Sequence, residues 1–236
     1  MLIRAYLPQI LTALFGGLFV FLGITTFGNA WAFDRIYVSL LVFTGLVCRK
    51  DINVVSVIII LVLQLLWENL AWNLLVDENL VKVTLYLAAL YAAYYFRYDW
   101  LAKMVATIVI IASICEIYWY SNNYNAPEIY WYTWIMISNL LIRYLVFCRV
   151  SFVDKYYPKK GESVNLDWVI YKLYAVLTVL QAAMVFEYLS RHLIGFNDVL
   201  FVYYSYSYVV HIIGTIIIWA IFTENYKRLI LKLLKA

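Results

Sequence analysis

The chain has 236 residues, of which 66% are hydrophobic and 14% are charged. A soluble domain carries about 25% charged residues, so these values exclude an ordinary water-soluble core and make lipid the solvent for much of the surface. The net charge of +4 does not indicate nucleic-acid binding, because the basic residues lie in short loops between apolar runs and the aromatic residues alternate with aliphatic ones.

Long apolar runs separated by short polar turns predict an all-α, polytopic transmembrane helix bundle with about eight spans. In chain order, the expected spans are residues 7–28, 33–48, 52–76, 80–96, 101–120, 129–148, 168–190 and 199–222. The second and fourth spans are short, and they require Asp34, Arg35 and Lys82 to lie at the membrane interface. Residues 1–222 are therefore expected to form one transmembrane domain, with a single sizeable loop at residues 151–167.

The distribution of basic residues predicts that both termini lie on the cytoplasmic side. With the N-terminus inside, most of the 18 Lys and Arg residues fall in cytoplasmic segments. Only Arg35, Lys82 and Arg191 then lie on the outer side. Arg143 and Lys172 fall inside spans but within reach of the cytoplasmic face. This asymmetry is typical of multi-pass proteins, and the lack of a soluble module favours a bacterial inner (cell) membrane.

Residues 223–236 are predicted to form a basic amphipathic tail. Its basic face consists of Lys227, Arg228, Lys232 and Lys235. Leucine and isoleucine side chains share the opposite face, so the tail is expected to contact anionic lipids of the inner leaflet. A simple extension of the last helix into the cytoplasm would show the same pattern.

A weak repeat with a period of 48 residues runs through the chain. Each copy places a basic residue at the end of one helix, an Asp at the start of the next, and a Glu toward the outer end. The copies are Arg49, Asp51 and Glu68; Arg97, Asp99 and Glu116; and, distorted, Arg149, Asp167 and Glu187. The pattern indicates duplicated helical hairpins, although topology rules alone would place Arg or Lys at each cytoplasmic end. In the third copy, the spacing from Glu187 to Arg191 predicts an intrahelical ion pair.

Polar side chains inside transmembrane spans are costly and are the first candidates for function. The candidate polar cavity or conduit consists of Gln64, Glu68, Ser113, Glu116, Asn139, Gln181 and His211. His211 could relay a proton, because imidazole titrates near physiological pH. Alternatively, the neutral side chains of this set and His211 only bond neighbouring helices together, which contributes about 0.6 kcal/mol each on average. Glu68 and Glu116, like Glu187, would then be hydrated anchors in the outer headgroup zone.

Aromatic residues are dense in the outer turn of residues 118–134, where a membrane protein carries an aromatic belt. The candidate partner surface there consists of Tyr118, Trp119, Tyr120, Tyr130, Trp131, Tyr132 and Trp134. Large aromatic side chains at this level would face lipid or an external protein partner.

Motifs for catalysis are missing from the sequence, which contains no HExxH, GxSxG, P-loop or GxGxxG pattern. Three cysteines and two histidines show no metal-ligand spacing, so no metal, cofactor or enzyme activity is expected. The leading hypothesis is a non-catalytic membrane subunit or interaction protein with a protein partner or a second copy of itself. The alternatives are a small ion or proton channel or transporter, and a lipid-modifying membrane enzyme.

Overall fold

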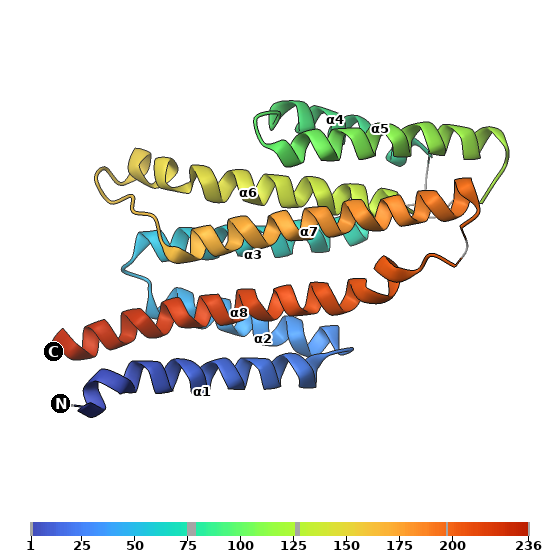
Figure 1. The fold of residues 1–236 in the computed structure, drawn as a ribbon. Coiled ribbons are helices and arrows are strands. Elements are labelled where there is room, and N and C mark those ends of the chain that lie inside the picture. The colour runs from blue at the N-terminus through green and yellow to red at the C-terminus, as the bar shows by residue number, and fades with distance from the viewer. Residues whose placement is uncertain (1, 75–78, 126–127, 197, 236) are drawn as a thin grey trace. The chain divides into compact units, whose positions relative to one another are not determined.

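The computed structural model describes residues 2–74, 79–125, 128–196 and 198–235 (Figure 1). For residues 2–13, 72–74, 225 and 228–235 the description covers the backbone alone. Within these ranges every regular element is helical, which confirms the all-α prediction. In chain order the elements are α1 (Leu2–Thr26), α2 (Ala30–Val47), α3 (Ile52–Leu74), α4 (Asn79–Tyr95), α5 (Trp100–Ser121), α6 (Tyr130–Tyr156), α7 (Asn165–Leu189), the π-helical turn η1 (Ser190–Ile194) and α8 (Phe201–Lys235).

Six helices among the described residues are long and apolar enough to cross a membrane, and they indicate a multi-pass membrane protein. These segments are Ala30–Val47, Ile52–Ala71, Trp100–Ser121, Tyr130–Tyr156, Asn165–Ile194 and Phe201–Glu224. The described part of α1 that was searched, Leu14–Thr26, is shorter, and α4 has only 17 residues. The total of eight spans and the side on which the termini lie stay predictions.

Two boundaries differ from the expected ones. The predicted loop at residues 151–167 is shorter, because α6 continues to Tyr156 and α7 begins at Asn165. At the other end of the chain, α8 continues to Lys235 without a break at residue 223. Lys227 is exposed, whereas the side chains of Arg228, Lys232 and Lys235 lie outside the described residues. Contact of this tail with the inner leaflet stays a prediction.

The Asp residues of the repeat begin helices. Asp51 Oδ1 accepts a hydrogen bond from the Asn53 amide at 3.1 Å, and Asp99 Oδ1 accepts one from the Leu101 amide, also at 3.1 Å. The first amides of a helix have no partner within the helix, and a carboxylate at the cap supplies one. The first two copies of the repeat therefore share the same capping geometry at the starts of α3 and α5. Duplicated helical hairpins stay a hypothesis.

The chain forms two compact units, each of which combines segments distant in sequence. Unit 1 comprises Met1–Ile59, Arg149–Ile170 and Tyr208–Ala236, and unit 2 comprises Ile60–Cys148 and Tyr171–Ser207. The core of unit 2 lies on one face of α5, where α4 packs along it (Figure 1). Leu101, Ala102, Val105, Val109 and Ala112 are fully buried there, at the helical spacing of an apolar stripe.

In unit 1, α1 and α8 approach closely at small residues. A Cβ atom added to Gly23 of α1 would lie 2.9 Å from Thr215 Oγ1 of α8. A Cβ atom added to Gly214 of α8 would lie 2.8 Å from Cζ of Phe33 in α2. Small residues at such crossings let helix backbones pack against each other within a membrane. Aromatic contacts extend this interface, since the ring centroids of Phe19 and Phe222 are 5.1 Å apart.

Candidate functional site

Four of the seven candidate conduit residues meet in unit 2. Asn139 Nδ2 of α6 donates a hydrogen bond to Gln181 Oε1 of α7 at 2.7 Å, and both side chains are buried. Within α3, Gln64 Nε2 donates to Glu68 Oε1 at 2.8 Å. The Tyr174 hydroxyl of α7 donates to Gln64 Oε1. Polar side chains of α3, α6 and α7 are thus bonded to one another inside the bundle.

Tyrosine side chains extend this polar cluster toward α8. Tyr206 lies close to Gln181 and within electrostatic range of Glu68. The Tyr206 ring meets Tyr132 edge to face, with centroids 5.7 Å apart. Sequence reasoning did not include Tyr174 or Tyr206 among the candidates, because a tyrosine in an aromatic-rich membrane chain carries no signal of its own.

The other three candidates lie elsewhere. The Ser113 hydroxyl donates to the Val109 carbonyl oxygen of its own helix at 2.7 Å, so it is satisfied within α5. Glu116 accepts a hydrogen bond from the Tyr86 hydroxyl at 3.3 Å, between α4 and α5. His211 belongs to unit 1. The structure therefore groups Gln64, Glu68, Asn139 and Gln181, whereas Ser113 is bonded within α5 and Glu116 is bonded to Tyr86 of α4.

His211 closes the C-terminal end of α1. Its Nε2 atom lies 2.7 Å from the Gly23 carbonyl oxygen, which requires a proton on Nε2, and 3.4 Å from Thr26 Oγ1. The carbonyl of Gly23 is in the last turn of α1, where helix carbonyls have no regular partner. The Phe33 ring packs against the imidazole at a centroid distance of 4.7 Å. In this geometry, His211 acts as a link between α8 and α1.

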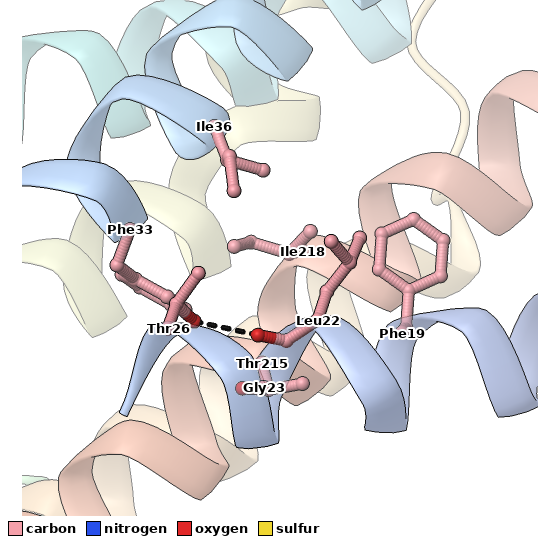
Figure 2. A pocket seen from close by; sticks show the side chains of 8 residues that line it. All are labelled: Phe19, Leu22, Gly23, Thr26, Phe33, Ile36, Thr215 and Ile218. Carbon is pink, nitrogen blue, oxygen red and sulfur yellow. Dashed lines mark hydrogen bonds between the residues drawn. The ribbon is translucent and has the colours of Figure 1, made fainter. Parts of the chain in front are cut away.

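A small pocket lies next to this link (Figure 2). Its lining consists of Phe19, Leu22, Gly23, Thr26, Phe33, Ile36, Thr215 and Ile218. The Thr26 hydroxyl, which lines the pocket, donates to the Leu22 carbonyl oxygen at 2.7 Å, as the dashed line in Figure 2 marks. The volume is about 10 Å³, which is that of a single water molecule at most. The pocket is a packing defect at the α1–α8 crossing and too small for an organic ligand.

The buried guanidinium of Arg143 forms an ion pair with the partly buried carboxylate of Asp99 in unit 2. Arg143 Nη2 of α6 lies 2.8 Å from Asp99 Oδ2 at the start of α5. Arg143 Nη1 donates to the Tyr171 carbonyl oxygen of α7, and the guanidinium stacks over the Tyr171 ring at 3.8 Å. The Arg143 side chain is buried against the chain's own acceptors, and its partner Asp99 begins α5, at the helix end that the charge distribution places on the cytoplasmic side. That Arg143 lies within reach of the cytoplasmic face stays a prediction.

Arg149 plays the corresponding part in unit 1, where it is only 1% exposed. Its Nε and Nη2 atoms donate to the two carboxylate oxygens of Asp167 at 2.7 and 2.5 Å. Nη1 lies within 3.2 Å of acceptors on Asn53 and Ser56, and Nη2 donates to the Glu162 carbonyl oxygen at 2.7 Å. All five N–H donors of the guanidinium therefore have acceptors. The repeat had singled out Arg149 and Asp167, but their spacing did not reveal that they pair.

Glu187 caps α8 from the preceding helix. Its side chain is 3% exposed, and its two carboxylate oxygens accept hydrogen bonds from the amides of Val202 at 2.6 Å and Tyr203 at 3.0 Å. The expected ion pair with Arg191 is therefore wrong. A helix N-terminus attracts an anion through its free amides and its dipole. The Glu187 carboxylate therefore binds the first amides of α8 and not Arg191, which lies one turn away.

The candidate partner surface divides into buried and exposed members. Trp119 and Tyr130 are each 2% exposed and belong to the core of unit 2, which removes them from an external surface. Trp131, Tyr132 and Trp134 are half-buried. Tyr118 and Tyr120 are 58% and 71% exposed at the C-terminal end of α5. The exposed part of the predicted surface is therefore much smaller than the sequence suggested.

No cluster of three or more His, Cys, Asp or Glu side chains that could hold a metal ion occurs among the described residues. Comparisons of the chain with protein-family models, with curated proteins and with solved structures found no match.

Proposed function

We propose that the chain is a non-catalytic subunit of a larger membrane complex, in which its helices form a fixed scaffold. One observation supports this most: the buried polar side chains described above bind one another. Asn139 pairs with Gln181, the guanidinium groups of Arg143 and Arg149 are held by acceptors of the chain, and Glu187 caps α8. Fully bonded polar networks make a helix bundle rigid.

The chemistry of the polar cluster favours a scaffold over a proton path. Gln64 stands between Glu68 and Tyr174, and an amide cannot pass on a proton without becoming an imidic acid. In addition, α3 to α7 contain no Gly or Pro. Transporters often bind substrate at helices broken by such residues, so continuous helices are better suited to a static role.

Exposed tyrosines at the end of α5 support a partner-binding role. Tyr118 and Tyr120 are exposed there, and Tyr124 follows in the next turn at 47% exposure. Tyrosine combines a large apolar area with a hydroxyl group and is enriched at protein interfaces. We therefore place the partner contact on these three residues, in place of the wider aromatic surface that the sequence predicts.

The test is affinity purification of a tagged chain from its native membrane in mild detergent, with a photo-crosslinking amino acid at Tyr120. We expect a stoichiometric partner and a discrete crosslinked product. The matched control carries the crosslinker at Tyr204 of α8, which is 66% exposed, and should give lipid adducts only. A monodisperse monomer that crosslinks to no protein from either position would refute the subunit proposal.

A second candidate is a small ion conduit, which the meeting of Gln64, Glu68, Asn139 and Gln181 favours. In proteoliposomes, Glu68→Gln should then reduce flux. Glu116→Gln is the matched control, because Glu116 occupies the corresponding place in the repeat and accepts a hydrogen bond from Tyr86 of α4. His211→Ala should leave flux intact if His211 only links helices. Flux no greater than that of empty liposomes at any pH would eliminate this candidate.

A further inference from the structure

The loop between α6 and α7 is held in one conformation by buried side chains of unit 1. Asn53 Nδ2 donates to the Lys160 carbonyl oxygen at 2.9 Å, and Asn53 Oδ1 accepts from the Glu162 amide at 2.9 Å. Arg149 binds the Glu162 carbonyl oxygen, and Asp154 Oδ1 accepts from the Gly161 amide at 2.7 Å. Such contacts fix the backbone of residues 157–164, so their side chains leave the surface in defined directions.

Lys159 occupies a position at which glycine would be more stable. Its φ angle is +64°, in the left-handed region that non-glycine residues seldom adopt. The turn is closed by a hydrogen bond from the Lys160 amide to the Tyr157 carbonyl oxygen at 3.1 Å. A strained residue persists only where the surrounding structure holds it, and often where its side chain is needed.

Basic side chains gather around this loop. We define the basic face as Arg49, Lys50, Lys155, Lys159 and Lys160, all of which are exposed. The hydrogen bonds of Asn53 place the α2–α3 turn, which carries Arg49 and Lys50, beside the loop that carries Lys159 and Lys160. Two acidic residues, Asp154 and Glu162, are exposed nearby, and Asp154 is engaged with the Gly161 amide. The balance of charge on this face is positive.

The basic face lies at the ends of three candidate membrane spans. The candidate spans Tyr130–Tyr156 and Asn165–Ile194 flank the loop on either side, and Ile52–Ala71 begins directly after the α2–α3 turn. Tyr156 and Tyr157 are exposed beside the lysines. Tyrosine and lysine together are typical of the lipid headgroup level, where the ring lies among acyl chains and headgroups and the ammonium reaches phosphate.

We propose that the basic face is a preformed binding site for the headgroup phosphate of anionic phospholipids. The exposed tyrosines favour a lipid over an acidic protein segment, because they need the headgroup layer that surrounds the same loop. The proposal does not rest on the scaffold function, since a conduit or an enzyme would retain the site. It predicts recognition by an ordered arrangement of charges, beyond the general attraction of a positive protein to an anionic bilayer.

The test uses the full chain in mixed micelles that contain equal amounts of phosphatidylglycerol and phosphatidylcholine, with bound lipid counted by native mass spectrometry. A lysine near an anionic surface contributes about fivefold in affinity. We therefore expect Lys159→Gln/Lys160→Gln to reduce the preference for phosphatidylglycerol about 30-fold. The charge-matched control Lys103→Gln/Lys172→Gln, which removes two exposed lysines of unit 2, should retain the preference.

Asn53→Ala separates an ordered site from diffuse charge. This variant leaves the net charge unchanged but removes the side chain that holds the Lys160 and Glu162 backbone, so the preference should fall several-fold. Circular dichroism verifies that the variant keeps its helices. Were Asn53→Ala to retain the full preference, or the two double variants to lose it equally, the ordered site would be disproved. The absence of any preference for phosphatidylglycerol in the unaltered chain would also disprove the site. Capture of an acidic protein through Lys159 and Lys160 would show that the basic face binds protein and not lipid.

Lys159→Gly tests the site with a variant that is expected to be more stable than the unaltered chain, so a loss of lipid preference cannot be attributed to poor folding. Glycine relieves the left-handed strain at this position, so the unfolding temperature in phosphatidylcholine micelles should rise while the preference for phosphatidylglycerol falls about fivefold. The control Lys160→Gly removes the neighbouring charge without this relief, because Lys160 is not among the residues with positive φ. A rise in stability with unchanged lipid preference would show that Lys159 is not part of the site.

Discussion

Arg149 shows how much of the fold depends on single buried charges. Its guanidinium, fully satisfied by Asp167, Asn53, Ser56 and the Glu162 carbonyl oxygen, joins segments of α3, α6 and α7 within unit 1. Removing one member of such a group leaves the others buried without a partner. This costs more stability than replacing the whole group with apolar side chains.

Arg149→Met should lower the free energy of unfolding by about 3–5 kcal/mol, because it leaves the Asp167 carboxylate unpaired. Chemical unfolding in neutral detergent micelles, followed by circular dichroism, measures this loss. The control Arg97→Met removes an exposed arginine, and a surface change of this kind should stay within about 0.5 kcal/mol. Equal stability of the two variants would contradict the role of Arg149.

Glu187→Gln should loosen the start of α8 while the rest of the helix is kept. Glutamine retains one acceptor oxygen but loses the charge that two amides share, and a cap of this kind contributes about 0.5–2 kcal/mol. Hydrogen exchange of the Val202 and Tyr203 amides should become faster, and that of Ile213 in the same helix should not change. Unchanged exchange at both amides would mean that the carboxylate is not their principal partner.

At the level of the helix, most of the fold could be predicted from the sequence. Each expected span coincides with one helix, because lipid demands long apolar runs with internally bonded backbones, and Asp51 and Asp99 mark helix starts by the chemistry of the cap. Helix ends were less predictable. The apolar run that predicts the span ends at Cys148, whereas α6 continues to Tyr156, and Arg149 in this extension bonds to residues of α3 and α7.

The crossing of α1 and α8 gives a prediction about a helix pair. Gly23→Ala should destabilise the chain by about 1–3 kcal/mol, because the new methyl group would meet Thr215, whose hydroxyl is held by the His211 carbonyl oxygen at 2.8 Å. The double variant Gly23→Ala/Thr215→Ala should recover most of the loss. Thermal unfolding in detergent measures both.

The matched control for that crossing is Gly16→Ala in the same helix. No atom lies within 4 Å of a Cβ added at Gly16, so the higher helix propensity of alanine should leave stability unchanged or raise it by up to about 1 kcal/mol. Similar losses at both glycines would indicate that α1 responds to alanine in general and not to its contact with Thr215.

For the molecule as a whole, the sequence predicted which residues are buried in a helix but not which helices meet. Asn139 and Gln181 are 42 residues apart. Helical periodicity predicts the face of the helix on which each of them lies, but not which helix packs against that face. For the same reason, Trp119 and Tyr130 were predicted to face a partner although they fill the core of unit 2. The sequence singled out His211 because an imidazole can relay a proton near physiological pH. In the structure, its position is explained by the hydrogen bond to the Gly23 carbonyl oxygen, which has no regular partner within α1.

The number of membrane crossings depends on α1 and α4, which are not among the six candidate spans. The role of α4, with 17 residues, can be tested directly. If α3 and α4 both cross, Lys50 and Tyr98 lie on the same side of the membrane, since these two helices separate them. Single cysteines at Lys50 and Tyr98, in a chain whose three native cysteines are replaced by alanine, should then react with an impermeant maleimide from the same side only. Labelling from opposite sides would place α4 along the membrane surface and reduce the count.

The pairing of Arg149 also bears on the order in which the chain is made. Asn53 and Ser56 are synthesised before Arg149, whereas the Glu162 carbonyl and the Asp167 carboxylate follow it. The complete set of acceptors for the guanidinium therefore exists only after the first turn of α7 has been synthesised. Closure of this group, which joins α6 and α7 to the start of α3, is thus a late event in the synthesis of the chain.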